Sequence, residues 1–178
     1  MKLCDFGLSK IISDRTWTLC GTAEYVAPEM ISGSGHGLSV DWWSLGIMTY
    51  EMIRGVAPFS ADTAYDTYRM IARSKLTFDS SFSRMPKCRS FVQGLLQRDR
   101  RKRLGCGKGG VKGLKKHKWL SGIDWSAVLN AQAQVPYTMD VKGDDDTSFF
   151  KDYPESDEDK TLPLNGEERE QFNVFYNF

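Results

Sequence analysis

The chain has 178 residues, of which 40% are hydrophobic and 26% charged, as expected for one compact domain or a domain plus a tail. It contains no run of about 18 consecutive apolar residues and no apolar N-terminal stretch, so we expect neither a membrane span nor a secretory signal. The four cysteines are widely spaced without a CxxC pair, so we expect reduced thiols and a cytoplasmic location.

The net charge of +1 conceals an uneven distribution along the chain. Residues 1–139 carry 20 basic against 11 acidic side chains, a net +9, and residues 140–178 carry 4 against 12, a net −8. Basic residues are densest from Arg98 to Lys118, where only Asp99 opposes them. Such a run can attract nucleic acid, but more often it is a solvated face or is partly neutralised by an acidic tail. Because no aromatic pairs interleave it, we expect no nucleic-acid partner.

The first elements in chain order are a loop and a helix. The first thirty residues show no helical period and predict a long ordered loop, a kind of segment that is usually functional. A helix is predicted over residues 40–53. Its apolar side chains would occupy most of the helix circumference, which indicates a helix buried inside the domain. Ser39 is its expected N-cap, Asp41 suits the first turn, and Gly55 would end it.

Two further helices are predicted over residues 63–74 and 87–97. Their apolar sides comprise Tyr65, Tyr68, Met70 and Ile71 in the first, and Phe91, Val92, Leu95 and Leu96 in the second. A Gly-rich loop over residues 104–110 precedes a short helix to Trp119. From about Gln132 the periodicity fades, and we expect an extended tail that docks, since disordered tails are poor in aromatic residues.

Short motifs then follow one another in a defined order. Asp5-Phe6-Gly7 by itself would be interpreted as an acidic residue at a turn. It does not stand alone, because Ala27-Pro28-Glu29 begins 22 residues after Asp5. Asp41-Trp42-Trp43-Ser44-Leu45-Gly46 and Arg103-Leu104-Gly105 come after it. In this order the motifs resemble the C-terminal lobe of protein kinases. The segment Arg15-Thr16-Trp17-Thr18-Leu19-Cys20-Gly21-Thr22 is similar to that of the cAMP- and cGMP-dependent kinases of the AGC group.

The resemblance implies a mainly α fold: the helical C-terminal lobe of a protein-kinase-like α+β fold with an extended AGC tail, the N-terminal lobe being absent. The expected parts are an activation segment over residues 1–30, a helical lobe over 31–125 and the tail over 126–178.

The resemblance also implies ATP and Mg²⁺ as cofactors. Asp5 corresponds to the carboxylate that holds Mg²⁺ against the nucleotide phosphates, since a hard cation prefers oxygen ligands. Phe150 resembles the tail aromatic over the adenine pocket, and Thr22 a hydroxyl that supports the catalytic carboxylate. The catalytic residues themselves belong to an HRDxxxxN loop, which this sequence does not contain.

Two threonines resemble phosphorylation sites. Thr18 corresponds to the activating site, which implies an upstream activating kinase, and Lys10 to a cation that contacts the phosphate. The other interpretation of Thr18 is a plain exposed hydroxyl. Thr161 aligns with a second site in the tail.

Several residues resemble the substrate-binding side. Glu51 corresponds to the acid that binds an arginine before the phosphoacceptor, so the expected substrates are proteins with Arg or Lys there. Without the matched motifs, Glu51 would be interpreted as a helix-surface charge. Leu19, Ala23 and Val26 correspond to the pocket for the residue after the phosphoacceptor. Ala23 stands where most relatives have proline, and the loss of that rigid φ is expected to loosen the pocket.

The remaining correspondences are structural. Glu29 and Arg103 resemble a buried ion pair between the activation segment and the helical lobe, and Asp41 an acceptor for backbone N–H groups of the catalytic loop. Phe172 and Phe175 resemble the hydrophobic motif that inserts into a groove of the N-terminal lobe. A regulatory subunit or a cyclic-nucleotide-binding domain is implied as a further partner.

Two functions follow from these features. The first is the C-terminal fragment of a basophilic serine/threonine kinase of cyclic-nucleotide-dependent type, which transfers the ATP γ-phosphate to protein substrates. This chain alone is then expected to be inactive, because it lacks the catalytic loop and nucleotide lobe. The second is a non-catalytic binding module, a decoy or scaffold that uses the substrate groove and tail. Asp5 favours the first, since a decoy needs no magnesium ligand.

Overall fold

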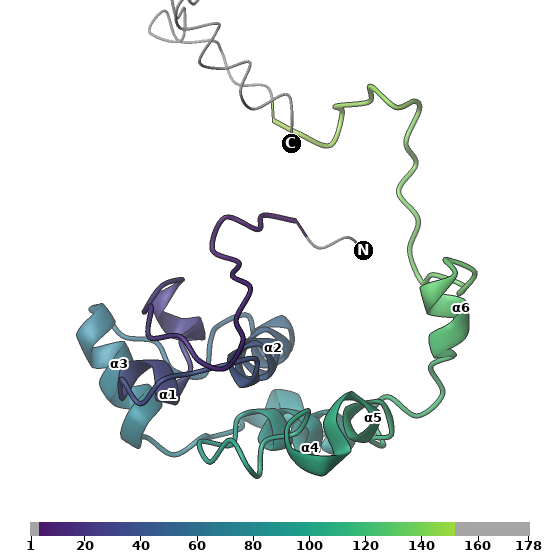
Figure 1. The fold of residues 1–178 in the computed structure, drawn as a ribbon. Coiled ribbons are helices and arrows are strands. Elements are labelled where there is room, and N and C mark those ends of the chain that lie inside the picture. The colour runs from purple at the N-terminus through teal and green to yellow at the C-terminus, as the bar shows by residue number, and fades with distance from the viewer. Residues whose placement is uncertain (1–3, 152–178) are drawn as a thin grey trace, which may run out of the picture. The chain divides into compact units, whose positions relative to one another are not determined.

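A computed structural model describes residues 4–151, and its contacts divide the chain into a first unit up to Gln132 and a second from Ala133. All regular elements lie in the first unit, and within the described residues they are helices, with no strand (Figure 1). The expected mainly α fold is confirmed for this part of the chain. No helix described there is long and apolar enough to cross a membrane.

The helices follow the order of the chain. The α-helices are α1 (Pro28–Ile31), α2 (Ser39–Arg54), α3 (Ala64–Arg73), α4 (Pro86–Leu95), α5 (Gly110–Lys115) and α6 (Trp125–Leu129). Short 3₁₀ helices lie at η1 (Ala23–Tyr25), η2 (Ser80–Phe82) and η3 (Gly107–Gly109). The sequence-predicted loop over the first thirty residues therefore ends in η1 and α1, and residues 126–132 of the expected tail lie in the first unit.

Helix α2 is the centre of the first unit. Its residues Trp43 and Ile47 are fully buried in the main hydrophobic cluster, together with side chains from α3 and α4. Gly46 lets α4 approach closely, since a Cβ there would lie 2.7 Å from Leu96 Cδ2. Gly55 ends α2 with φ of 82°, a conformation that glycine adopts without strain, as predicted.

The start of α2 differs from the prediction. Ser39 is the first helical residue rather than the N-cap, which is Leu38 and makes no side-chain capping bond. The Ser39 hydroxyl instead donates to Glu29 Oε1 at 2.9 Å. A buried carboxylate needs such donors, and it takes the hydroxyl that would otherwise cap the helix.

Helix α3 lies close to its predicted position, but Tyr65 is not on its apolar side. The Thr63 side chain caps the helix by accepting the Asp66 N–H at 3.1 Å. Thr67 and Ile71, one turn apart, are buried, whereas Tyr65 is 75% exposed. Tyr65 precedes Thr67 by two residues, and side chains at that spacing point to opposite faces of a helix.

The later helices are shorter than predicted. Helix α4 ends at Leu95, although the following Leu96 is still buried. Helix α5 ends at Lys115 rather than at Trp119, because the chain turns there: the Trp119 N–H donates to His117 Nδ1 at 3.2 Å. A second hydrophobic cluster joins α5 to α4 through Leu114, Phe91 and Leu95.

Candidate functional site

A pair of backbone hydrogen bonds anchors the part of the chain that precedes η1. Thr16 and His36 form an antiparallel bridge in which each N–H donates to the other carbonyl at 2.9 Å. The Trp17 ring lies against Gly35, whose φ is 77° and whose Cβ, if present, would lie 3.1 Å from that ring. The segment is therefore anchored to the loop between α1 and α2.

The anchor places Lys10 near the predicted phosphorylation site. Lys10 Nζ donates to Thr16 Oγ1 at 3.2 Å, and Thr16 Oγ1 lies 3.4 Å from Thr18 Oγ1. Thr16 links Lys10 to Thr18, a role that the sequence analysis did not predict. The signal was the spacing: residues two apart in an extended segment lie on the same side of the chain. Thr18 is exposed, so its hydroxyl is open to modification.

Asp5 is exposed and has a φ of 61°, which is unusual for a residue with a side chain. Its Oδ1 accepts the Gly7 N–H at 3.2 Å, and its second carboxylate oxygen has no partner among residues 4–151. The described residues contain no group of three metal-ligating side chains. A single carboxylate fits Mg²⁺ all the same, because this ion is commonly bound by one or two carboxylates, phosphates and water.

A cavity of about 290 Å³ brings Thr22 and Glu51 together. It lies between η1 and the end of α2, and its lining comprises Thr22, Glu24, Tyr25, Glu51, Gly55, Val56, Ala57 and Ser60. Ser60 Oγ donates to Glu24 Oε1 at 3.3 Å across it. The cavity is thus lined by two carboxylates, which suits a cationic ligand.

The Glu51 carboxylate is held by a residue that sequence reasoning missed. The Tyr25 hydroxyl donates to Glu51 Oε2 at 2.5 Å. This hydrogen bond, with burial and the negative charge of Glu51, raises the pKa of Tyr25 to about 12. The partners are 26 positions apart in the sequence, so no periodic signal predicts this contact.

The structure does not bring Leu19, Ala23 and Val26 into that cavity. Leu19 is 49% exposed, whereas Val26 is buried in the main body of the first unit. None of the three is among the cavity's lining residues. The Val26 side chain is 2% exposed and packs beneath the surface of the first unit.

Glu29 and Arg103 form a buried ion pair. Nη1 and Nη2 of Arg103 donate to Oε1 and Oε2 of Glu29 at 2.7 and 2.8 Å, and Ser39 Oγ adds a third bond. Burial disfavours the ionised Glu29, but the bonds and charge of Arg103 outweigh it and hold the pKa of Glu29 below its ordinary value. The Arg103 guanidinium also lies 5.2 Å from the centre of the Trp43 ring.

Asp41 lies in the first turn of α2, where its carboxylate is exposed and has no hydrogen-bond partner among the described residues. It is available to accept backbone N–H groups of another segment. Thr161, Phe172 and Phe175 lie outside the residues that the structure describes.

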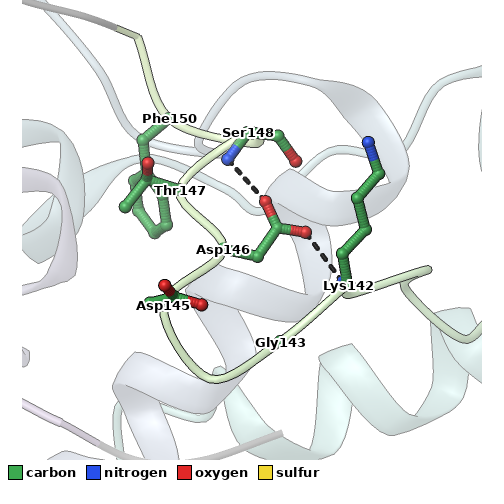
Figure 2. A pocket seen from close by; sticks show the side chains of 7 residues that line it. All are labelled: Lys142, Gly143, Asp145, Asp146, Thr147, Ser148 and Phe150. Atoms are coloured by element: carbon green, nitrogen blue, oxygen red, sulfur yellow. Dashed lines mark hydrogen bonds between the residues drawn. The ribbon is translucent and has the colours of Figure 1, made fainter.

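Phe150 belongs to the second unit, in a loop organised by Asp146 (Figure 2). The Asp146 carboxylate accepts the N–H groups of Lys142 and Ser148, both at 2.9 Å, and these bonds lower the pKa of Asp146. The loop borders a cavity of about 450 Å³ to which Phe150 contributes, although its side chain is 75% exposed.

Comparison with known proteins gives consistent matches. The family model described as protein kinase domain matches residues 1–120. The cAMP-dependent protein kinase catalytic subunit PRKX of Mus musculus is 42% identical over 175 residues, which are 98% of this chain and 49% of the mouse protein. The cAMP-dependent protein kinase catalytic subunit 3 of Drosophila melanogaster is 39% identical, with 98% of this chain and 30% of that protein covered.

A cGMP-dependent relative matches at a similar level. The cGMP-dependent protein kinase 2 of Homo sapiens is 40% identical over 158 residues, which cover 86% of this chain and 20% of the human protein. The chain thus spans half or less of the length of the curated relatives that it matches.

Proposed function

Because this chain belongs to the protein kinase family, we propose that it is the C-terminal portion of a basophilic serine/threonine kinase of the cyclic-nucleotide-dependent type. The enzyme transfers the γ-phosphate of ATP to Ser or Thr in proteins that carry Arg or Lys before the phosphoacceptor. Residues 1–30 form its activation segment, 31–125 its helical lobe and 126–178 its tail.

The observation that carries the proposal is the orientation of Glu51. One carboxylate oxygen is engaged by Tyr25, and the other has no partner among the described residues while the side chain lines the cavity. A carboxylate held in this way is preorganised for a guanidinium, since the two groups form strong charge-assisted hydrogen bonds. Glu24 adds a second negative charge at the same cavity. Substrate arginine is the ligand that this arrangement suits.

The other residues have roles around this substrate site. Asp5 would hold Mg²⁺, which supplies charge neutralisation of the ATP phosphates when bound. Thr22, which shares the cavity with Glu51, would position the acceptor side of the site. Leu19, Ala23 and Val26 would contribute to the pocket after the phosphoacceptor once a peptide is bound.

Regulation would act through the activation segment. A phosphate on Thr18 adds about −2 charge. It would lie close to Lys10, because the Thr16 hydroxyl contacts both the Lys10 ammonium and the Thr18 hydroxyl. An upstream kinase would add this phosphate, and a regulatory subunit or cyclic-nucleotide-binding domain would supply the signal. Thr161, Phe150, Phe172 and Phe175 would act in the tail.

The 178 residues alone are proposed to bind peptide without transferring phosphate. Phosphoryl transfer needs a catalytic base and a nucleotide lobe besides the parts found in this sequence. Asp41 is the residue to which a catalytic loop would attach.

The test compares the protein purified from its native source with the recombinant 178-residue chain. Both are assayed for MgATP-dependent phosphate transfer to a serine peptide with arginine two and three residues before the serine, and for peptide binding. We expect phosphate transfer by the native protein only and peptide binding by both proteins. Glu51→Gln should weaken this binding. Glu167→Gln, elsewhere in the sequence, should leave it unchanged. Binding by the native protein without transfer would favour the non-catalytic module instead.

A further inference from the structure

The region from η3 to α6 presents a surface of lysines without ion-pair partners. Five exposed lysines make up this lysine surface: Lys108, Lys112, Lys115, Lys116 and Lys118. None of them forms a salt bridge with an acidic side chain in residues 4–151. Asp124 is the one acidic residue between positions 100 and 139, and its Oδ1 already accepts the N–H groups of Ser126 and Ala127.

The packing of α5 turns these lysines outward. Leu114 is buried against Phe91 and Leu95 of α4. Lys112 and Lys116 lie two residues to either side of Leu114, and side chains at that spacing point to the opposite face of a helix. Lys115 Nζ lies 4.9 Å from the centre of the Trp125 ring, which extends the basic surface to α6.

Large apolar side chains accompany the lysines. Val111 is 49% exposed in α5 and Leu129 is 85% exposed at the end of α6, and three more lie between them: Trp119, Ile123 and Val128. Such side chains are costly in water but favourable at the boundary between lipid headgroups and acyl chains. Exposed lysines in the same segment as exposed aliphatic and aromatic groups are therefore typical of a peripheral membrane surface.

We propose that this surface, α5, α6 and the turns beside them, docks on a bilayer that contains anionic phospholipid. Flexible lysine ammonium groups act as point charges that suit a diffuse negative surface, whereas specific phosphate or base recognition relies on the arginine fork. The aromatic residues here are isolated along the chain rather than arranged as a platform for successive bases, which argues against nucleic acid. The inference does not depend on kinase activity.

The test measures binding of the full 178-residue chain to phosphatidylcholine vesicles with and without phosphatidylserine, at low and at physiological salt. We expect binding that requires phosphatidylserine and weakens with salt. The variant Lys112→Gln/Lys115→Gln/Lys116→Gln should bind about 100-fold more weakly, at roughly five-fold per lysine near an anionic surface. Leu129→Gln should weaken the binding that remains at higher salt.

A matched variant controls for net charge. Arg73→Gln/Lys75→Gln/Arg84→Gln removes three exposed charges outside the lysine surface, at the end of α3 and before α4, and should bind as the unmodified chain does. The proposal is overturned if the full chain does not bind phosphatidylserine vesicles or if both triple variants lose binding equally. It is also overturned if the lysine variant loses binding to single-stranded RNA while its vesicle binding is unchanged.

Discussion

Arg103 reaches across 74 residues of sequence to clamp both carboxylate oxygens of Glu29, at 2.7 and 2.8 Å. The guanidinium is fully enclosed, and it also donates through Nε to the Gln97 carbonyl and through Nη1 to the Ser39 carbonyl. The clamp joins the start of α1 to the loop after α4 and to the first turn of α2. It thereby ties the segment that precedes α1 to the helical body.

Arg103→Met should destabilise the first unit by about 3–5 kcal/mol, because it leaves the Glu29 charge buried without its partner. Arg101→Met is the matched control: Arg101 pairs with Asp99 on the surface, where water screens both charges, so its loss should change the unfolding free energy little. Chemical denaturation of both variants measures the difference. Equal midpoints for the two variants would contradict this account of the clamp.

The same ion pair predicts an acid-sensitive stability. The folded pKa of Glu29 lies below its ordinary value of 4.5, so ionised Glu29 contributes stability that is present above pH 4.5. This contribution is lost as the pH falls below 4.5 through the folded pKa. The difference in unfolding free energy between the unmodified chain and Glu29→Gln should therefore be constant near neutral pH and shrink in acid. A difference that grows in acid would have the wrong sign.

The Tyr25 hydroxyl should lose its proton at an unusually high pH. Its pKa of about 12 means that the neutral hydroxyl donor is favoured by the fold, and Glu51→Gln should move the value back toward 10.0. Glu24→Gln should have a smaller effect, because Glu24 is the weakest of the contributing charges. NMR titration of the tyrosine ring carbons across the alkaline pH range measures the Tyr25 pKa in the Glu51→Gln and Glu24→Gln variants. A larger shift in the Glu24 variant would refute the assignment of the Tyr25–Glu51 bond as the main cause.

Phosphate on Thr18 should be sensed by Lys10. A nearby cation favours the dianionic phosphate, so the second phosphate pKa, ordinarily about 6, should be lowered in the phosphorylated chain. Lys10→Met should raise it again, whereas Lys75→Met, an exposed lysine near the end of α3, should leave it unchanged. Phosphorus NMR titration reads this value directly. Identical curves for the phosphorylated Lys10→Met variant and the unmodified phosphorylated chain would show that the two groups do not interact.

The close approach of α2 and α4 depends on Gly46. Gly46→Ala places a methyl group 2.7 Å from Leu96 Cδ2 and should cost about 1–3 kcal/mol through overpacking. Gly113→Ala in α5 meets nothing within 4 Å, and it should stabilise the chain by about 0.4–1 kcal/mol because alanine favours a helix. Thermal unfolding separates the two alanine variants. The packing argument fails if Gly46→Ala is as stable as Gly113→Ala.

Features that depend on neighbours within one or two turns could be predicted without the structure. The helix predicted over residues 40–53 is present as α2, because apolar side chains surround most of its circumference, and its end follows from Gly55, which adopts a positive φ without strain. The kinase family follows instead from the specific order of motifs along the chain, and the resemblance in turn implies the mainly helical fold. These signals are local or linear, so no knowledge of the packing was needed.

Contacts between residues far apart in the sequence could not be predicted in this way. The Tyr25 bond to Glu51, the use of the Ser39 hydroxyl by Glu29 and the exposure of Tyr65 all depend on how helices pack. A side chain's propensity acts over a few residues, whereas a buried carboxylate takes whichever donors the fold brings within reach. For that reason Ser39, a good capping residue by local rules, was predicted wrongly, and its true partner is visible only in the folded chain.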